Sequence, residues 1–143
     1  MTTVLVKHLM TTPVVTFFAE QTMPLADDVM RLKHFRHLPV IDEEGRLVGL
    51  VSHRDLLGAQ ISSETGLDRT QRHAFQKDVR VSQIMTHDVW TVLPDTRAAT
   101  AAETLLDHRF GCLPVVDGAG KLVGIVTERD FLRFASKILD QHG

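Results

Sequence analysis

The chain has 143 residues, 43% apolar and 24% charged, as is usual for a soluble globular domain, and its formal net charge of -2 gives no overall positive field to attract nucleic acid or anionic lipid. Its single cysteine, Cys112, cannot form an intramolecular disulfide, and the chain has neither signal-peptide features nor the roughly 18 to 20 apolar residues needed to cross a bilayer. We therefore expect a cytoplasmic protein without membrane contact.

The first predicted elements are a short strand and an amphipathic helix. Val14-Val15-Thr16-Phe17 is a β-branched run typical of a strand. Residues 22–35 place apolar side chains at helical spacing, with Thr22 as the expected N-cap and Pro24 in the first turn. We expect this helix to bury one apolar stripe, formed by Leu25, Val29, Leu32 and Phe35.

A hairpin and a second helix follow. Residues 37–41 and 47–52 are predicted as strands, joined by the polar turn Asp42-Glu43-Glu44-Gly45. The next helix is expected to begin near His53, with Ser52 as its cap. Asp55 then lies in the first turn, where a carboxylate interacts favourably with the helix dipole.

The second half of the chain is predicted to have the same element order. The intervening segment begins with polar residues and leaves room for a short helix at residues 67–77. After it we expect a strand at 89–92, a helix at 96–109, a hairpin at 112–127 and a long C-terminal helix with an apolar stripe.

These two halves are an internal repeat. Leu38-Pro39-Val40 returns 75 positions later as Leu113-Pro114-Val115, and residues 7–57 share 18 identities with residues 82–132 over 51 aligned positions. Two such units can bury a shared core that neither completes alone. We expect a first repeat at residues 1–57, a connector at 58–80 and a second repeat at 81–143, which together form one compact module.

Each repeat carries a hydroxyl residue at the end of its third strand and an aspartate three positions later. These pairs are Ser52 with Asp55, and Thr127 with Asp130. Together with Met-Thr before each first strand and Leu-Pro-Val in each hairpin, the ordered set resembles a pair of CBS domains, named after cystathionine β-synthase. The resemblance implies an α+β fold in which two β-α-β-β-α repeats pack sheet to sheet with pseudo-two-fold symmetry.

The same resemblance implies a function. CBS pairs commonly receive AMP, ADP, ATP or S-adenosylmethionine in two related clefts, with backbone near residues 11–14 or 86–89 reading the base. They sense the ligand and do not transform it, and many form homodimers. The resemblance also implies an effector protein, whose identity does not follow from this sequence. The expected protein is therefore a regulatory sensor of energy state or metabolites, which is not an enzyme and requires no cofactor.

The residue types agree with such a ligand. A first-turn carboxylate can accept hydrogen bonds from both hydroxyls of a ribose, which is the role expected of Asp55 and Asp130. A helix N-terminus with a hydroxyl favours phosphate, which is the role expected of Ser52 and Thr127. Apolar walls and backbone polar groups for the adenine are expected from six residues, namely Thr11, Val14, Val40, Thr86, Val89 and Val115.

The two repeats differ in the basic residues predicted to hold phosphate. The first repeat has Arg36, His37, His53 and Arg54, whereas the second has Gly111 and Cys112 in the places of Arg36 and His37, and keeps Arg129 beside Asp130. Arginine grips phosphate in bidentate fashion, and Gly and Cys do not. We therefore expect the Asp55 cleft to prefer a phosphorylated nucleotide, unless basic residues reach across to the other cleft.

Other interpretations stay open. The two aspartates stabilise helices by about 0.3–1 kcal/mol each without any ligand, and N-capping explains both hydroxyl residues. A structural homodimer without nucleotide is the main alternative, favoured by the C-terminal helix with Phe131 and Phe134. Nucleic-acid binding would rest only on the basic stretches 31–36 and 69–77, and neither a metal cluster nor a catalytic motif is expected.

Overall fold

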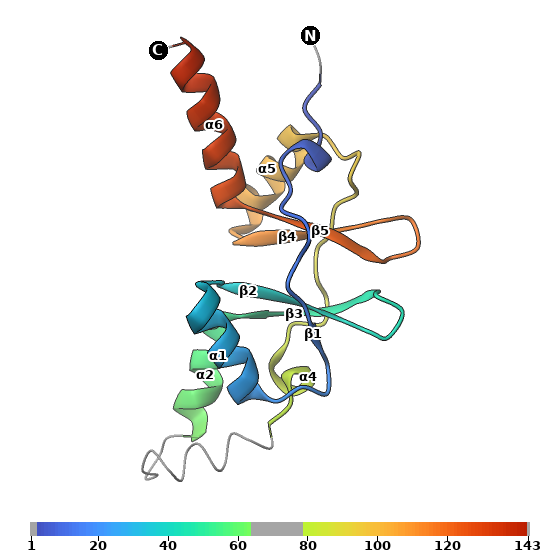
Figure 1. Ribbon diagram of the computed structural model, residues 1–143, viewed down its shortest axis with the longest axis vertical. Helices are drawn as coiled ribbons and strands as arrows, with labels where there is room; N and C mark the ends of the chain where they lie inside the picture. Colours follow the sequence, from blue (N-terminus) through green and yellow to red (C-terminus); the bar gives the residue numbers. More distant parts are fainter. Residues whose placement is uncertain (1–2, 64–78, 143) are drawn as a thin grey trace. The chain divides into compact units, whose positions relative to one another are not determined.

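The computed structural model describes residues 3–63 and 79–142 (Figure 1). The chain divides into two compact units. One unit is Val15–Asp88, which we call the Asp55 unit, and the other combines Met1–Val14 with Val89–Gly143, which we call the Asp130 unit.

The Asp55 unit contains a mixed sheet and two longer helices. The sheet has the order β1-β2-β3, in which β1 runs parallel to β2 and β2 runs antiparallel to β3. Helices α1 and α2 contact each other and lie on the same side of the β2–β3 hairpin (Figure 1). The bounds are β1 Phe17–Phe18, α1 Met23–Lys33, β2 His37–Ile41, β3 Leu47–Ser52, α2 His53–Ser63 and α4 Val81–Ile84.

The hairpin and the start of α2 are confirmed, but the first two predictions need correction. The first strand is the short β1, which pairs Phe17 with Val40, and not residues 14–17. Helix α1 buries the side chains Met23, Ala26 and Met30. The predicted stripe lies largely on the solvent-exposed side of the helix. Leu25, Leu32 and Phe35 are 44%, 77% and 39% exposed, and of the four predicted residues only Val29 packs against the core.

Helix α1 has apolar residues on more than one face, which explains that error. The spacing of Met23, Ala26 and Met30 is as helical as the spacing of the predicted stripe. Thr22 is the N-cap as expected, although its side chain makes no capping hydrogen bond. The last helical residue is Lys33, and the C-cap His34 has a positive φ of 58°, the left-handed geometry that commonly ends helices.

The Asp130 unit repeats the hairpin and the two longer helices. Strands β4 Cys112–Val116 and β5 Leu122–Thr127 are antiparallel, with helices α5 Ala98–His108 and α6 Glu128–His142 on the same side of them (Figure 1). A 3-10 helix, η1 Val6–His8, comes from the start of the chain. The strand predicted at 89–92 is wrong, because that segment forms only an isolated parallel bridge between Val92 and Val115.

The two hairpins have the same register. His37 pairs with Ser52 in one, and Cys112 pairs with Thr127 at the equivalent positions of the other. Both hairpins also shift register at the last pair, before Ile41 and Val116. The repeat in the sequence is therefore a repeat in backbone geometry.

Each compact unit contains the Met-Thr segment of the other sequence repeat. In the Asp130 unit, Thr11 and Ile125 exchange backbone hydrogen bonds of 2.8 and 3.1 Å. In the Asp55 unit, Leu50 and Thr86 exchange the equivalent bonds of 3.0 and 2.8 Å. The boundaries of the compact units therefore differ from those of the sequence repeats. The boundaries of the repeats stay a prediction.

The two hydrophobic cores reflect this exchange. Val81 belongs to the core of the Asp55 unit, and its counterpart Val6 belongs to the core of the Asp130 unit. Around Val81 the buried residues are Phe17, Met23, Ala26, Met30, Leu38, Val40, Val51 and Leu56. Around Val6 they are Ala101, Leu105, Leu113, Val115 and Val126.

Part of the predicted connector is helical. Helix α2 continues to Ser63, and α4 begins at Val81, directly after the expected connector. The short helix considered for residues 67–77, and the basic stretch 69–77, lie outside the described residues.

Candidate functional site

The candidate sites lie where a strand of each hairpin enters the following helix. In the Asp55 unit, Ser52 N donates a hydrogen bond to Asp55 Oδ2 at 2.8 Å, and Asp55 N donates to Ser52 Oγ at 3.0 Å. This reciprocal pair satisfies two backbone N–H groups at the start of α2. Ser52 therefore has the capping geometry that the simpler interpretation predicted.

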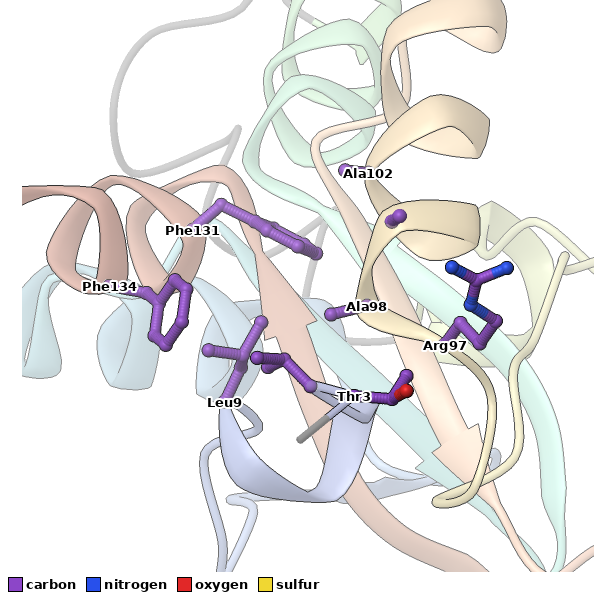
Figure 2. A pocket seen from close by; sticks show the side chains of 9 residues that line it. Thr3, Leu9, Arg97, Ala98, Ala102, Phe131 and Phe134 are labelled. Atoms are coloured by element: carbon purple, nitrogen blue, oxygen red, sulfur yellow. The ribbon is translucent and has the colours of Figure 1, made fainter. Parts of the chain in front are cut away.

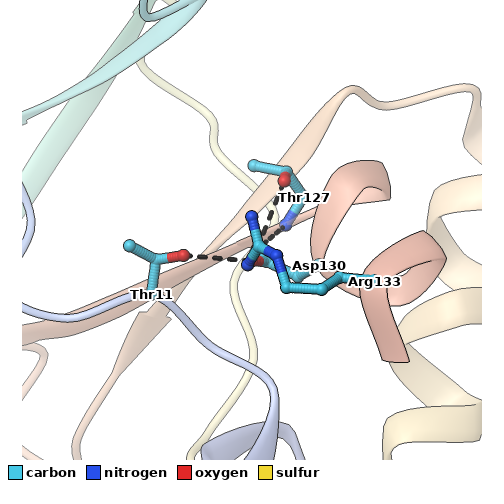
Figure 3. Close-up of polar contacts among 4 residues, drawn as sticks. All are labelled: Thr11, Thr127, Asp130 and Arg133. Carbon is cyan, nitrogen blue, oxygen red and sulfur yellow. Dashed lines mark hydrogen bonds and ion pairs between the residues drawn. The ribbon is translucent and has the colours of Figure 1, made fainter. Parts of the chain in front are cut away.

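The carboxylate of Asp130 has more partners (Figure 3). Its Oδ2 accepts hydrogen bonds from Thr127 N at 2.8 Å and from Thr127 Oγ1 at 3.2 Å. Its Oδ1 accepts one from Thr11 Oγ1 at 3.0 Å and one from Arg133 Nη1 at 3.3 Å. Asp130 is only 4% exposed, so this cluster holds a buried carboxylate by four donors.

One predicted base-reading segment contacts an aspartate, and the other pairs with the strand that leads to an aspartate. The side chain of Thr11 contacts Asp130, and the backbone of Thr86 pairs with Leu50 on the strand that leads to Asp55. Val14 and Val89 are half-buried, whereas Val40 and Val115 are fully buried in the cores. The last two valines therefore expose neither side chain nor backbone at the surface.

The predicted phosphate-binding residues are mostly on the surface. Arg36, His53, Arg54 and Arg129 are exposed and His37 is half-buried. The backbone joins two of them, because His53 N donates to Arg36 O at 2.8 Å. Among the described residues of each unit, no side-chain hydrogen bond or ion pair joins Arg36, His53 or Arg54 to Asp55, or Arg129 to Asp130.

Arg133 is a site residue that the sequence analysis missed. It lies three positions after Asp130 on α6, a spacing at which helical side chains meet. The Asp-x-x-Arg pattern was the signal that could have identified it. The equivalent position after Asp55 is Gly58, which has no side chain to offer.

Cys112 is not a reactive group. Its side chain is buried on β4, and burial raises the pKa of the thiol to about 12. The thiol is therefore protonated near neutral pH and is a poor nucleophile. In residues 3–63 and 79–142, no three His, Cys, Asp or Glu side chains come together as a metal site would require.

A separate hollow of about 420 Å³ lies in the Asp130 unit (Figure 2). Phe131 and Phe134 of α6 form one wall, and Ala98 and Ala102 of α5 form another, with Leu9 between them. Both phenylalanines, which the sequence analysis assigned to dimer formation, are half-buried here. None of the predicted ligand-binding residues lines this hollow.

Among the described helices, none combines the length and the apolar content that a membrane span requires.

The family model described as CBS domain matches the chain twice, over residues 6–62 and 81–137. A CBS domain-containing protein of Dictyostelium discoideum is 33% identical over 140 residues, which cover 96% of this chain and 94% of that protein. The two matches coincide with the two hairpin–helix repeats described above.

Two solved structures that contain adenosine compounds are similar to this chain. The crystal structure of CBSX2 in complex with AMP superposes with a TM-score of 0.79 at 33% identity, covering 94% of this chain and 98% of that one. The CBS domain pair of protein MJ0100, in complex with 5′-methylthioadenosine and S-adenosyl-L-methionine, gives 0.78 at 26% identity, covering 95% and 98%.

Proposed function

Because the chain belongs to the CBS domain family, we propose that it is a regulatory module that senses adenosine-containing compounds at Asp55 and Asp130. The observation that carries the proposal is that each unit has a first-turn carboxylate after a strand that is bridged to a Met-Thr segment. AMP, ADP, ATP and S-adenosylmethionine are the proposed ligands.

Each part of such a ligand has a candidate partner. The ribose hydroxyls would donate to the two carboxylates in charge-assisted hydrogen bonds, and the helix N-termini at Ser52 and Thr127 would favour phosphate. The backbone next to Thr11 and Thr86 would read the adenine edge. The similar structures that hold AMP or S-adenosyl-L-methionine support this class of ligand.

Sensing, and not catalysis, is the proposed mechanism. Regulation requires only that the ligand bind two conformations of the module with different affinity, which shifts their populations. An effector protein would read the favoured conformation. We place the module in the cytoplasm, where the free thiol of Cys112 would stay reduced.

The test is calorimetric titration with AMP, ADP, ATP, S-adenosylmethionine and NAD. At least one adenosine compound is expected to bind, and Asp55→Ala and Asp130→Asn are each expected to remove one site. Asp117→Ala, which changes a carboxylate that accepts hydrogen bonds within the β4–β5 turn, is the matched control and should bind as the parent protein does. A well-folded parent protein that binds none of the panel contradicts the proposal.

A second candidate function is homodimer formation, favoured by exposed leucines on the helices of both units. Leu32 of α1 and Leu106 of α5 are each 77% exposed, and Leu132 and Leu139 of α6 are 71% and 69% exposed. Such side chains are commonly covered in an interface. We expect light scattering to give the mass of a dimer, and the double variant Leu132→Lys and Leu139→Lys to give a monomer. A monomeric parent protein contradicts this candidate.

A further inference from the structure

We propose that Arg133 makes the Asp130 site selective for adenosine ligands with an anionic 5′ group, whereas the Asp55 site, with Gly58 in the equivalent place, lacks this selectivity. This inference rests on the proposed function and adds the residue that determines the charge of the ligand. The four residues involved at the Asp130 site are drawn in Figure 3.

The carboxylate of Asp130 has no free acceptor position for a ribose. A carboxylate offers about four acceptor sites, and Asp130 receives four hydrogen bonds. A ribose hydroxyl must therefore displace one donor. Thr127 N is fixed by the backbone, whereas the Arg133 side chain is 56% exposed and makes the longest of the four bonds, at 3.3 Å. Arg133 is the partner that a ribose displaces most easily.

A displaced Arg133 becomes a cation beside the ligand. An uncharged nucleoside separates this guanidinium from Asp130 and has no anionic group for the guanidinium to bind. A 5′-phosphate offers oxygens that arginine can bind in bidentate fashion. The Asp130 site should therefore discriminate strongly between AMP and adenosine.

The Asp55 site has the opposite properties. Oδ2 of Asp55 accepts from Ser52 N, while no hydrogen bond among the described residues reaches Oδ1, so a ribose finds an open acceptor. Gly58 takes the place of Arg133 and provides no cation. This assignment reverses the expectation from Arg36 and Arg54, whose exposed side chains form no hydrogen bond or ion pair within the described residues.

The first experiment isolates the Asp130 site with Asp55→Asn and measures binding of AMP and adenosine by calorimetry. Adding Arg133→Ala is expected to weaken AMP binding about 10- to 100-fold, as for loss of a charge-assisted hydrogen bond. Adenosine binding should be unchanged or tighter. Equal changes for the two ligands, or no change for either, would overturn the inference.

The second experiment moves the arginine. A Cβ at Gly58 would meet no atom of the described residues within 4 Å, so a side chain can begin at this position of α2. In an Arg133→Ala background, which has no arginine at either position, Gly58→Arg should restore a preference for AMP over adenosine. Circular dichroism and thermal unfolding confirm that each variant is folded.

The outcomes separate the two proposals. If the parent protein binds neither AMP nor adenosine nor any other adenosine compound, the proposed function fails and this inference fails with it. If both ligands bind and neither arginine change alters the ratio of their affinities, only the inference on Arg133 fails.

Discussion

The Asp55 and Asp130 sites use one backbone frame with different side-chain surroundings. Both have a carboxylate whose Oδ2 accepts from the backbone N–H three residues earlier, at 2.8 Å in each case. Both have a Met-Thr segment paired to the strand that leads into the helix. Asp55, however, is half-buried and one of its oxygens receives no hydrogen bond from the described residues, whereas Asp130 is buried with both oxygens engaged.

The difference shows how a duplicated motif can serve two purposes. The parts common to both sites set where a ribose would sit, and they depend on residues that are identical or similar in the two repeats. The parts that differ, notably Gly58 against Arg133, set the charge that the ligand meets. Under the proposed function, geometry and selectivity would be carried by separate positions and could be changed separately.

The largest expected effect comes from removing each carboxylate in turn. Asp130→Ala leaves a backbone N–H, two hydroxyls and Arg133 without their shared acceptor, although the exposed Thr11 and Arg133 can turn to water. Unsatisfied buried groups cost roughly 1–3 kcal/mol, and we expect a loss within that range. Asp55→Ala removes a half-buried capping partner and should cost about 1 kcal/mol or less.

Urea unfolding of the unliganded protein measures both losses. Asp130→Asn, which keeps one acceptor oxygen, should recover part of the stability that Asp130→Ala loses. Equal losses for Asp55→Ala and Asp130→Ala would mean that the two carboxylates contribute equally to the free energy of unfolding. That result would contradict the difference between the two sites described above.

A smaller effect is expected at the glycines where the Met-Thr segments pack. A Cβ at Gly49 would overlap Sδ of Met85 and lie 3.0 Å from Thr86 O, and one at Gly124 would lie 2.6 Å from Sδ of Met10 and 3.3 Å from Thr11 O. Overpacking of this kind costs typically about 1–3 kcal/mol, and a flexible methionine absorbs part of it. We therefore expect about 1–2 kcal/mol, with Gly49→Ala the more damaging.

The matched control is Gly118→Ala, since a Cβ there would meet no atom within 4 Å. It should leave the free energy of unfolding nearly unchanged. If Gly49→Ala and Gly124→Ala were as harmless as this control, close packing of the Met-Thr segments would have no role in stability.

The sequence predicted the parts of the fold that depend on local pattern. The hairpins at 37–52 and 112–127 follow from alternating apolar strands around a tight polar turn, and the structure confirms both. The buried face of α1 was not predictable in this way, because the face with Leu25 and Leu32 is as apolar as the face that is buried. Only long-range packing distinguishes them.

The same division holds for the candidate site. The aspartates and hydroxyl residues were identifiable because the motif occurs twice at fixed spacing. The contact between Thr11 and Asp130 spans 119 positions of sequence, and no local pattern indicates it. Arg133 was not predictable from the repeat, because the equivalent residue of the first repeat is Gly58.

The smallest expected effect concerns the two hairpin turns, which are closely matched. Asp42 Oδ1 accepts hydrogen bonds of 2.9 Å from both Glu44 N and Arg46 N, and Asp117 Oδ1 accepts bonds of 2.9 and 3.0 Å from Ala119 N and Lys121 N. Because both carboxylates hold the same turn at the surface, Asp42→Ala and Asp117→Ala should lower the free energy of unfolding at pH 7 by similar, small amounts.

The pH dependence of the Asp42 effect follows from its direction. The hydrogen bond from the backbone of Arg46 is the main cause that lowers the pKa of Asp42 below its ordinary value of 3.8. The folded state therefore binds the proton less tightly than the unfolded state, so the ionised carboxylate stabilises the fold above about pH 4. The advantage of the parent protein over Asp42→Ala in urea unfolding should be full at pH 7 and shrink as the pH falls through the lowered pKa. An advantage that grows on acidification would mean that the protonated form makes the stronger turn, and the hydrogen bonds of Asp42 would not be those of a carboxylate.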